Sequence, residues 1–279
     1  MTNRNWIPII NEAARIARSY STAVTLRQLH YRLVASGIGG YQNTQTCYKQ
    51  LSSLTAEERR NGTFPQLSDR TRGVERPLSF STPAQAIASI IAWYRRDYTE
   101  GQEFQTWVLY EKATLGAQIE SWTGPYGIPT AALRGYSSES LEREIFEAMN
   151  DDGRPVVVWY VGDLDPEGED IERNFQDQAA RQDIEFEHWE RLTVLPTQIG
   201  PLGLVPNPGK ASSPRAAGFI RKYGRLFQIE TEAVDPAVLE ALVIDAITNS
   251  FYFDEDVRQE SLEQEAQDRA RLEELRNSA

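Results

Sequence analysis

The amino-acid sequence predicts an α/β fold, in which a helical module of the winged-helix type precedes a parallel, Rossmann-like sheet covered by helices. Residues 5–60 have the apolar spacing of helices that are separated by turn signals. From residue 104 onward, short β-branched runs alternate with helical segments, which is typical of parallel sheets. The run Val156–Val161 is apolar at every position, as in a strand that is buried on both faces.

Composition and charge indicate a globular protein with an uneven charge distribution. Of the 279 residues, 40% are hydrophobic and 25% are charged. Residues 1–100 hold 13 Lys and Arg against 7 Asp and Glu, a balance of +6, and residues 101–279 hold 16 against 34, a balance of -18, so the net charge is -12. The sequence has no apolar run of the ~20 residues that span a bilayer. One cysteine and two histidines argue against a cysteine- or histidine-rich metal cluster. We therefore expect a cytoplasmic protein without a membrane span, in which a basic head precedes an acidic body.

The head, residues 1–82, is predicted to begin with helices. Thr25 and Gln28 have the spacing of a capping box, which marks the start of a helix. In that helix Arg27 and Tyr31 are four residues apart and share a face. The expected helices cover residues 5–19, Leu26 to Ser36 and about Thr44 to Arg60.

A basic wing is predicted to follow these helices. Asn61-Gly62 is a turn signal, and residues 63–72 have the pattern of a short β-wing. Helix, turn, helix and wing in this order favour a nucleic-acid-binding module, although many three-helix modules bind protein instead. The candidate contacts to the DNA backbone are Arg59, Arg60, Arg70 and Arg72.

Residues 83–253 are predicted to form the sheet domain, and residues 254–279 a charged tail. The tail is expected to be an exposed helix, either frayed or docked on a partner. The expected strands are Thr106–Tyr110, Thr130–Leu133, Val156–Val161, Leu192–Leu195 and Phe227–Ile229. The expected helices are Pro83 to about Tyr98, Thr114–Trp122, Ser138–Met149, Pro166 to about Arg181 and Pro236 to Ser250.

Carboxylates follow two of the predicted strands. Asp163 and Asp165 come after Val156–Val161 and lie on one side of the chain, because side chains alternate along a strand. Glu111 ends another strand, and the carboxyl ends of parallel strands meet at one edge. Carboxylates that repel each other usually share a hard cation. The sequence therefore predicts a Mg²⁺ site made by Glu111, Asp163 and Asp165, with Mn²⁺ as a possible substitute.

Simpler interpretations remain open for the same residues. Asp165 can be the N-cap of the following helix, and Glu111 can be surface charge that pairs with Lys112 or Arg134. The basic island within residues 196–224, which includes Lys210 and Arg215, is either a mobile loop that contacts phosphates or a solvated connection.

Gly162-Asp163-Leu164-Asp165-Pro166-Glu167-Gly168, with Glu111 upstream, resembles the Toprim motif of topoisomerases, primases and related nucleases. The Asp-x-Asp-Pro-x-Gly form is most similar to the A subunit of topoisomerase VI and to the meiotic double-strand-break transesterase. Arg27-Gln28-Leu29-His30-Tyr31 resembles the Arg-x-x-aromatic-Tyr segment of that family, with His30 in place of the usual aromatic residue. Glu230-Thr231-Glu232-Ala233 resembles a segment near the end of the Toprim domain in short bacterial and phage relatives.

The resemblance implies a CAP-like winged-helix domain followed by a Toprim domain. It also implies a Mg²⁺-dependent transesterification, in which Tyr31 attacks a DNA phosphodiester and forms a phosphotyrosyl bond. Arg27 would favour the phenolate or bind the scissile phosphate, and Glu111, Asp163 and Asp165 would hold the metal ion. A packing role for Tyr31 is the simpler alternative.

The partners implied are double-stranded DNA and a second copy of the chain, since family members act as homodimers with the tyrosine of one chain facing the metal of the other. A separate ATPase subunit would be needed for strand passage, because Gly37-Ile38-Gly39-Gly40 is too short and misplaced for a phosphate-binding loop. Two other functional classes remain open. One is a Toprim nuclease that hydrolyses DNA with metal-activated water, and the other is a non-catalytic DNA-binding or assembly protein.

Overall fold

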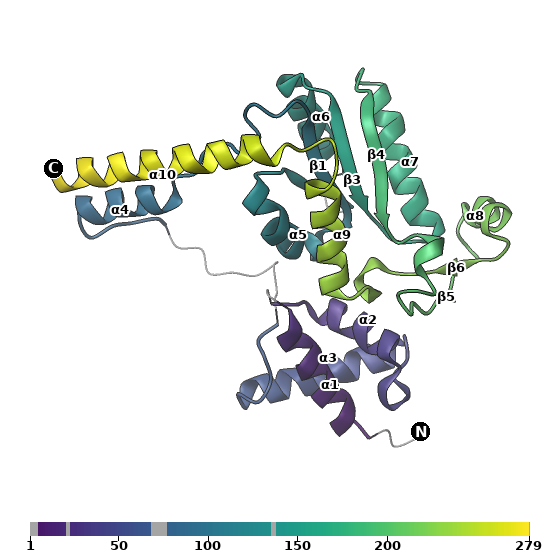
Figure 1. The fold of residues 1–279 in the computed structure, drawn as a ribbon. Coiled ribbons are helices and arrows are strands. Elements are labelled where there is room, and N and C mark those ends of the chain that lie inside the picture. Colours follow the sequence, from purple (N-terminus) through teal and green to yellow (C-terminus); the bar gives the residue numbers. More distant parts are fainter. Residues whose placement is uncertain (1–4, 21–22, 68–76, 135–137, 279) are drawn as a thin grey trace.

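The computed structural model describes residues 5–20, 23–67, 77–134 and 138–278. It consists of an N-terminal helical region, a parallel sheet with helices on its two faces, and an arm of paired helices (Figure 1). The helices are α1 (Ile7–Ser19), α2 (Leu26–Ser36), α3 (Gln45–Arg60), α4 (Pro83–Trp93), α5 (Gly116–Thr123), α6 (Ser138–Asp152), α7 (Pro166–Ala180), α8 (Ala216–Tyr223), α9 (Pro236–Thr248) and α10 (Glu255–Ser278). The strands are β1 (Gln105–Lys112), β2 (Thr130–Arg134), β3 (Val156–Val161), β4 (Phe186–Thr193), β5 (Asn207–Pro208) and β6 (Phe227–Gln228).

The three helices predicted for the N-terminal region are present. The predicted bounds of α2 are confirmed, and Thr25 and Gln28 form the predicted capping box at its start. Apolar side chains of α1, α2 and α3 pack together around Leu29, Leu33 and Leu51. Residues 63–67 of the predicted wing contain no strand, and residues 68–72 lie outside the described residues.

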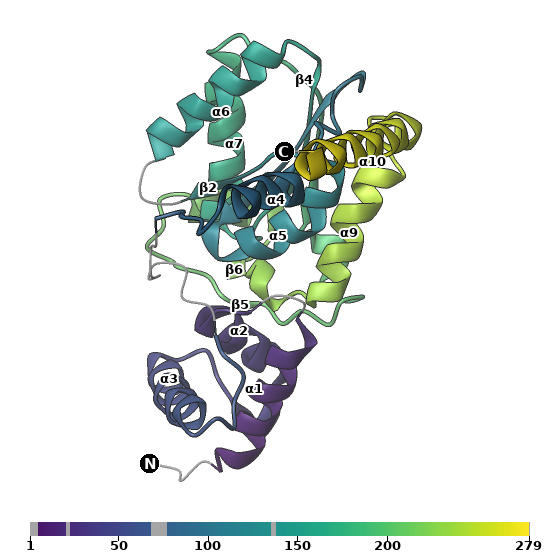
Figure 2. The ribbon, with the colours of Figure 1, turned by 90° about the vertical axis from the view of Figure 1, so that its left-hand side faces the viewer.

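The sheet is parallel and Rossmann-like, and its order within the described residues is β2-β1-β3-β4. The alternation of side chains sends Val157, Trp159 and Val161 to one face, where they pack with α5 and α9. It sends Val158 and Tyr160 to the other face, where they pack with α6 and α7. Figure 2 shows these helices on either side of the strands. Burial on both faces explains why β3 is apolar throughout.

Several predicted boundaries in this part of the chain are wrong. The strand predicted at Leu192–Leu195 is β4, which begins earlier, at Phe186, and ends at Thr193. Its first residues were missed because they carry polar and half-buried side chains at the edge of the sheet. The basic segment within 196–224 contains helix α8 and is not an irregular connection throughout. Glu111 and Lys112 belong to β1 and do not follow it.

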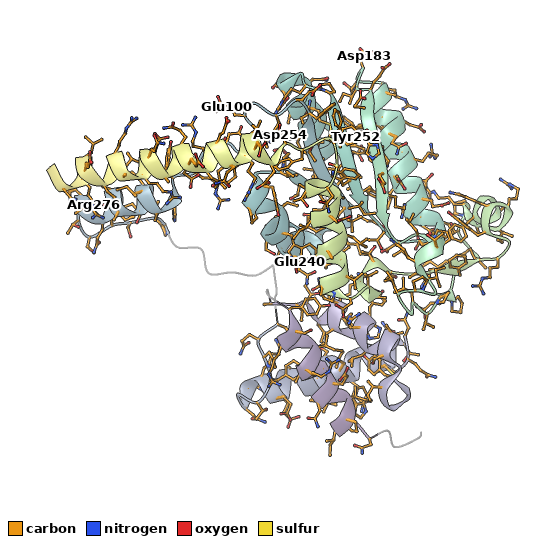
Figure 3. All side chains as sticks on the ribbon, in the orientation of Figure 1. Glu100, Asp183, Glu240, Tyr252, Asp254 and Arg276 are labelled. Carbon is orange, nitrogen blue, oxygen red and sulfur yellow. The ribbon has the colours of Figure 1, made fainter. Side chains whose placement is uncertain are left out.

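The helix α10 packs against α4, and the pair runs away from the sheet, with Arg276 near the free end (Figures 1 and 3). The tail is therefore a helix that docks on its own chain. The helix α4 ends at Trp93, short of the predicted Tyr98, because the backbone turns there and Arg269 of α10 bonds the carbonyl oxygens of Ile91 and Tyr94. In the part of the chain that the structure describes, we find no helix with the length and apolar character of a membrane span.

Glu265 fixes the base of this arm. Its carboxylate accepts hydrogen bonds from the Tyr98 hydroxyl at 2.7 Å and the Arg96 backbone N–H at 2.9 Å, and it pairs with Arg269. Glu265 and Tyr98 are buried.

We expect Glu265→Ala to lower the free energy of unfolding by about 1–3 kcal/mol, because it leaves the Tyr98 hydroxyl and the Arg96 N–H without their acceptor. Urea denaturation followed by circular dichroism measures this change. The same substitution at exposed Glu263 is the control and should change stability by less than about 0.5 kcal/mol. Equal effects of the two substitutions would contradict the assignment.

Candidate functional site

The predicted carboxylates converge at the carboxyl ends of β1 and β3. Glu111 is 1% exposed and its Oε2 accepts the backbone N–H of Asp163 at 2.9 Å. This bond joins the end of β1 to the residues that follow β3. Because Glu111 is buried, its interpretation as ordinary surface charge is wrong. The parallel pairing of Tyr110 with Val161 brings these strand ends together, as the sequence predicts.

Asp165 has the capping role that the simpler interpretation gave it. Its Oδ1 accepts the N–H of Gly168 at 2.6 Å, and Pro166 opens α7. Only glycine fits at position 168, because a Cβ there would lie 2.5 Å from the Asp163 carbonyl oxygen and 3.0 Å from Glu111 Oε2. The glycine therefore lets α7 begin directly against the carboxylates.

A second pair of carboxylates reaches the same place from the segment before α9. Leu164 and Ile229 form a backbone bridge, with N···O distances of 2.9 and 3.0 Å, which ties the Asp163–Asp165 turn to this segment. The Thr231 N–H donates to Asp163 Oδ1 at 2.8 Å. Glu230 and Glu232 flank Thr231, and Glu232 is 3% exposed. We call Glu111, Asp163, Asp165, Glu230 and Glu232 the acidic centre.

Lys112 is the cation at the middle of the acidic centre. Its Nζ lies 2.6 Å from Asp163 Oδ2 and 3.5 Å from Glu232 Oε2, and it also pairs with Glu230. Its side chain is 11% exposed. Burial of an ammonium lowers its pKa, but the three carboxylates outweigh this and raise the pKa of Lys112 above its ordinary value. Lys112 is therefore charged at neutral pH.

The carboxylates themselves differ in ionisation. Burial and the charge of Asp163 raise the pKa of Glu111 to about 7, and the same two causes raise the pKa of Glu230 to about 7. Burial also raises the pKa of Asp165. Burial opposes ionisation of Asp163 as well, but its ion pair with Lys112 keeps its pKa below the ordinary value. The acidic centre thus gathers five carboxyl groups around one buried lysine, and two of them, Glu111 and Glu230, are near the midpoint of their ionisation at neutral pH.

The helix α2 docks on the acidic centre. The Gln28 side-chain amide donates to Thr114 O at 3.2 Å and to Gln118 Oε1 at 3.1 Å. Arg32 donates to Ala233 O at 3.1 Å and pairs with Asp235 at 2.6 Å. Contacts between α2 and Thr231–Ala233 therefore join the N-terminal helical region to the sheet.

This docking places Tyr31 beside Lys112. The Lys112 Nζ is 5.6 Å from the centroid of the Tyr31 ring, and the Arg27 guanidinium carbon is 5.8 Å from it. Arg27 also lies 3.9 Å from Glu232 Oε2. Burial and the Glu230 charge raise the pKa of Tyr31, whereas Arg27 and Lys112 oppose the shift. Arg27 thus favours the phenolate, as the sequence predicts, but it does not outweigh burial.

His30, which replaces an aromatic residue in the predicted motif, is a packing residue. It is buried, and its ring nitrogens bond the Tyr41 hydroxyl at 2.7 Å and Asn43 Oδ1 at 3.1 Å. Burial lowers the pKa of His30, so its ring is neutral at physiological pH.

The predicted DNA contacts that the structure describes belong to α3 and to the segment around α8. Arg59 donates to Thr55 O within α3, and Arg60 is exposed at the end of that helix. Arg70 and Arg72 lie outside the described residues. Lys210 is exposed before α8. Arg215 pairs with Asp170 of α7 at 2.5 Å.

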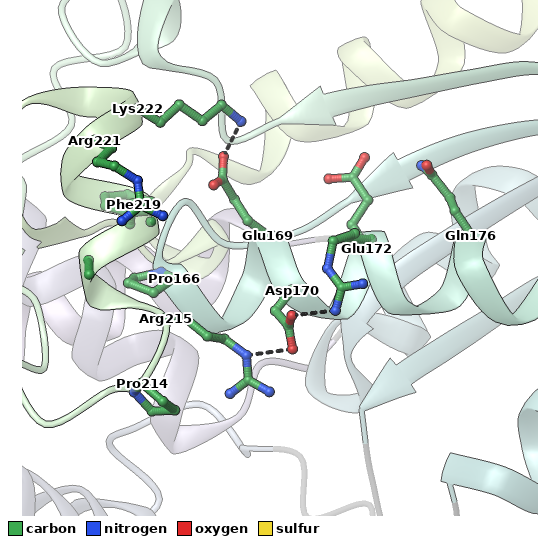
Figure 4. A pocket seen from close by; sticks show the side chains of 13 residues that line it. Pro166, Glu169, Asp170, Glu172, Gln176, Pro214, Arg215, Phe219, Arg221 and Lys222 are labelled. Atoms are coloured by element: carbon green, nitrogen blue, oxygen red, sulfur yellow. Dashed lines mark hydrogen bonds and ion pairs between the residues drawn. The ribbon is translucent and has the colours of Figure 1, made fainter.

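An open hollow of about 950 Å³ is lined by residues of α7 and α8 and lies beside Pro166. Figure 4 shows its cations facing the acids of α7, with Lys222 bonded to Glu169 at 2.7 Å and Arg215 to Asp170. These cations are thus largely neutralised by the hollow itself, and a phosphate there would have to displace carboxylates.

The acidic centre fits a divalent cation in its chemistry, although not as a ready-made cage. Within the described ranges, no group of His, Cys, Asp and Glu side chains is arranged to hold a metal ion. Lys112 and the Thr231 N–H occupy the Asp163 oxygens, and the Gly168 N–H occupies Asp165 Oδ1. Yet carboxylate oxygens are the hard donors that Mg²⁺ prefers, and those of Glu111, Asp163 and Asp165 lie at one edge of the sheet.

Sequence reasoning missed Lys112, Glu230 and Glu232 as members of the site. A signal for the glutamates was present, since they lie one residue apart after the predicted strand Phe227–Ile229, as Asp163 and Asp165 do after β3. No family model and no curated protein sequence matches the chain.

We expect the metal-free protein to lose stability as the pH rises from about 5 to 8. Glu111 and Glu230 have pKa values of about 7 in the folded state against 4.5 for an ordinary glutamate, so the folded protein binds more protons across this window. For one such group the change is on the order of 3 kcal/mol, and the two groups titrate together. Urea unfolding in the presence of a chelator measures it.

Glu111→Gln should reduce this pH dependence, because an amide cannot titrate and Glu230 alone then contributes. Glu103→Gln, at an exposed glutamate, is the matched control and should leave it unchanged. Stability that stays level or rises between pH 5 and 8 would contradict the charge assignment.

Proposed function

We propose that this protein cleaves double-stranded DNA by transesterification, in the manner of the A subunit of topoisomerase VI, with Tyr31 as the nucleophile. The observation that carries the proposal is the position of Tyr31 and Arg27 beside the acidic centre. The centroid of the Tyr31 ring lies 5.6 Å from Lys112 Nζ, and the Arg27 guanidinium carbon lies over the same ring. These residues are at least 80 positions from Glu111 and more than 130 from Asp163 in the sequence. Their convergence supports a shared chemical role. It is a convergence within one chain, whereas the resemblance implies that the tyrosine faces the metal of a second copy.

In the proposed reaction the Tyr31 oxygen attacks a phosphorus atom of the DNA backbone. A bond forms between the phenol oxygen and phosphorus, and the bond to the deoxyribose 3′ oxygen breaks. The phenol proton is lost and the leaving 3′ oxygen gains one, so no water, oxidant or reductant is consumed. The product carries a phosphotyrosyl link at the 5′ end and a free 3′ hydroxyl. Because one ester replaces another, the step is reversible.

The residues of the chain divide the remaining work. Arg27 and Lys112 place positive charge beside the phenol, which favours loss of its proton against the effect of burial. Glu111, Asp163 and Asp165 would hold Mg²⁺, or Mn²⁺ in its place. When bound, the ion supplies Lewis-acid stabilisation of negative charge on the phosphate oxygens.

The finer fold assignment belongs to the same proposal. We infer that the N-terminal helical region is a CAP-like winged-helix domain and that the sheet is a Toprim domain. Arg59, Arg60, Arg70, Arg72 and Lys210 would then contact DNA phosphates, and Arg215 would do so after release from Asp170. Since each chain carries Tyr31 once, cutting both strands takes two copies, which favours a homodimer. Strand passage would require a separate ATPase subunit.

Hydrolysis of DNA by metal-activated water is the second candidate. The observation that favours it is the raised pKa of Tyr31, which makes the phenol a poorer nucleophile. In that case the carboxylates would serve the attacking water, and Tyr31 would pack against Lys112.

We expect Tyr31→Phe to abolish protein-linked DNA ends. Supercoiled DNA is incubated with the protein and Mg²⁺ or Mn²⁺, denatured, and examined with and without protease treatment. Tyr48→Phe, at a half-buried tyrosine of α3 that also contacts His30, is the matched control and should retain the linked ends.

Other outcomes assign the protein to the alternatives. Free ends that persist in Tyr31→Phe but vanish in Asp163→Asn indicate hydrolysis. Intact DNA under both metals, with DNA binding retained in a gel-shift assay, indicates a non-catalytic DNA-binding protein.

A further inference from the structure

Arg191, on the edge strand β4, reaches across to the turn that joins β3 to α7. Its side chain is only 12% exposed. Its Nη1 donates to the Asp163 carbonyl oxygen at 2.9 Å, and its Nη2 donates to the Gly168 carbonyl oxygen at 3.4 Å. These two carbonyls stand at the ends of the turn, residues 163–168, that carries the Asp163 and Asp165 carboxylates. A single side chain therefore spans the whole turn.

The Arg191 guanidinium is itself held from two sides. Its Nε and Nη2 lie 2.7 and 2.6 Å from Glu172 Oε2, while the Trp189 ring N–H donates to Glu172 Oε1 at 2.7 Å. The guanidinium carbon also lies over the Tyr160 ring, 5.0 Å from its centroid. Rotation of the arginine would break the ion pair and the ring contact together, so its donors are fixed relative to β3 and α7.

Tyr160 connects this cluster to the backbone that leads into the turn. A Cβ at Gly162 would lie 2.6 Å from the Tyr160 ring, so the chain just before Asp163 runs directly against that ring. The Gly162 N–H also donates to the Thr193 carbonyl oxygen of β4 at 2.8 Å. The side-chain hydrogen bonds of Arg191 thus extend the attachment of this chain to β4 past the end of β3.

Stability alone does not account for an arginine at this position. The first turn of a helix favours negative charge over positive, and Gly168 belongs to the first turn of α7. A buried ion pair such as that of Arg191 with Glu172 contributes little net stability compared with well-packed apolar side chains. What the arrangement does supply is a defined geometry for the turn, because the planar guanidinium holds several acceptors in fixed directions.

We propose that Arg191 is a positioning residue of the acidic centre. It fixes residues 163–168 through their backbone rather than through their carboxylates, so that Asp163 keeps its place between Glu111 and Lys112. Its effect on DNA cleavage rests on the proposed function, whereas its hold on the turn does not.

Arg191→Lys tests the proposal, because lysine keeps the charge but cannot bond Glu172 and both carbonyl oxygens at once. We expect the rate at which protein-linked DNA ends form to fall by about 10–100-fold, with DNA binding in a gel-shift assay unchanged. Arg173→Lys is the matched control, since this exposed arginine of α7 pairs with Asp170 and Asp177, and it should leave the rate unchanged.

Hydrogen exchange measures the hold on the turn without any cleavage. The Asp163, Leu164 and Gly168 N–H groups are hydrogen-bonded within or across the turn. We expect peptides that cover residues 163–168 to exchange several-fold faster in Arg191→Lys, while peptides from α9 exchange as in the unchanged protein. Arg173→Lys should alter neither.

The outcomes separate this proposal from the proposed function. Faster exchange of the turn with an unchanged cleavage rate overturns the positioning role. Lower overall stability without a local change in exchange reduces Arg191 to a structural residue and also overturns it. If the unchanged protein forms no linked ends, the proposed function fails, and the exchange of the turn alone decides whether Arg191 holds it.

A second variant serves if Arg191→Lys folds poorly. Glu172→Gln keeps the shape of the side chain and removes the charge that orients Arg191. It should produce the same local increase in exchange over residues 163–168. Exchange of the turn that matches the unchanged protein contradicts the proposal.

Discussion

The ion pair between Lys112 and Asp163 is the interaction on which the functional part of this structure depends. It lies at the carboxyl ends of neighbouring parallel strands, where β3 delivers Asp163 and β1 delivers Lys112. Without a cation, the buried carboxylates of the acidic centre would repel each other at a cost that no packing there offsets. The lysine makes the acidic centre compatible with a folded, metal-free chain.

The same ion pair determines where α2 can dock. Glu230 and Glu232 are held against Lys112. Arg27 pairs with Glu232, and Arg32 bonds the carbonyl oxygen of Ala233 in the same segment. The helical region is therefore attached through the site itself rather than through a remote interface. A change in charge at the acidic centre, such as the binding of a metal ion or a phosphate, acts directly on the helix that carries Tyr31.

Local patterns in the sequence predicted the helices of the N-terminal region, β3, and the meeting of Glu111 with Asp163, because capping, periodicity and the geometry of parallel strands are short-range signals. They did not predict that Lys112 pairs with Asp163, because a lysine next to Glu111 at a strand end is equally consistent with a surface ion pair to Glu111. The docking of α10 on α4 could not be predicted either, because it depends on contacts such as that between Glu265 and Tyr98, which are 167 residues apart. The edge strand β4 was underestimated because partial exposure weakens its apolar pattern.

The central claim is that the Tyr31 oxygen becomes bonded to DNA, and mass spectrometry of the trapped adduct tests it most directly. Protein and DNA are incubated with Mn²⁺, denatured, and digested with nuclease and trypsin, which cuts after Arg27 and Arg32. The resulting peptide, Gln28-Leu29-His30-Tyr31-Arg32, contains a single tyrosine. The account predicts a nucleotide mass on Tyr31 of this peptide. An adduct on another peptide, or cleaved DNA whose ends carry no peptide, would contradict it.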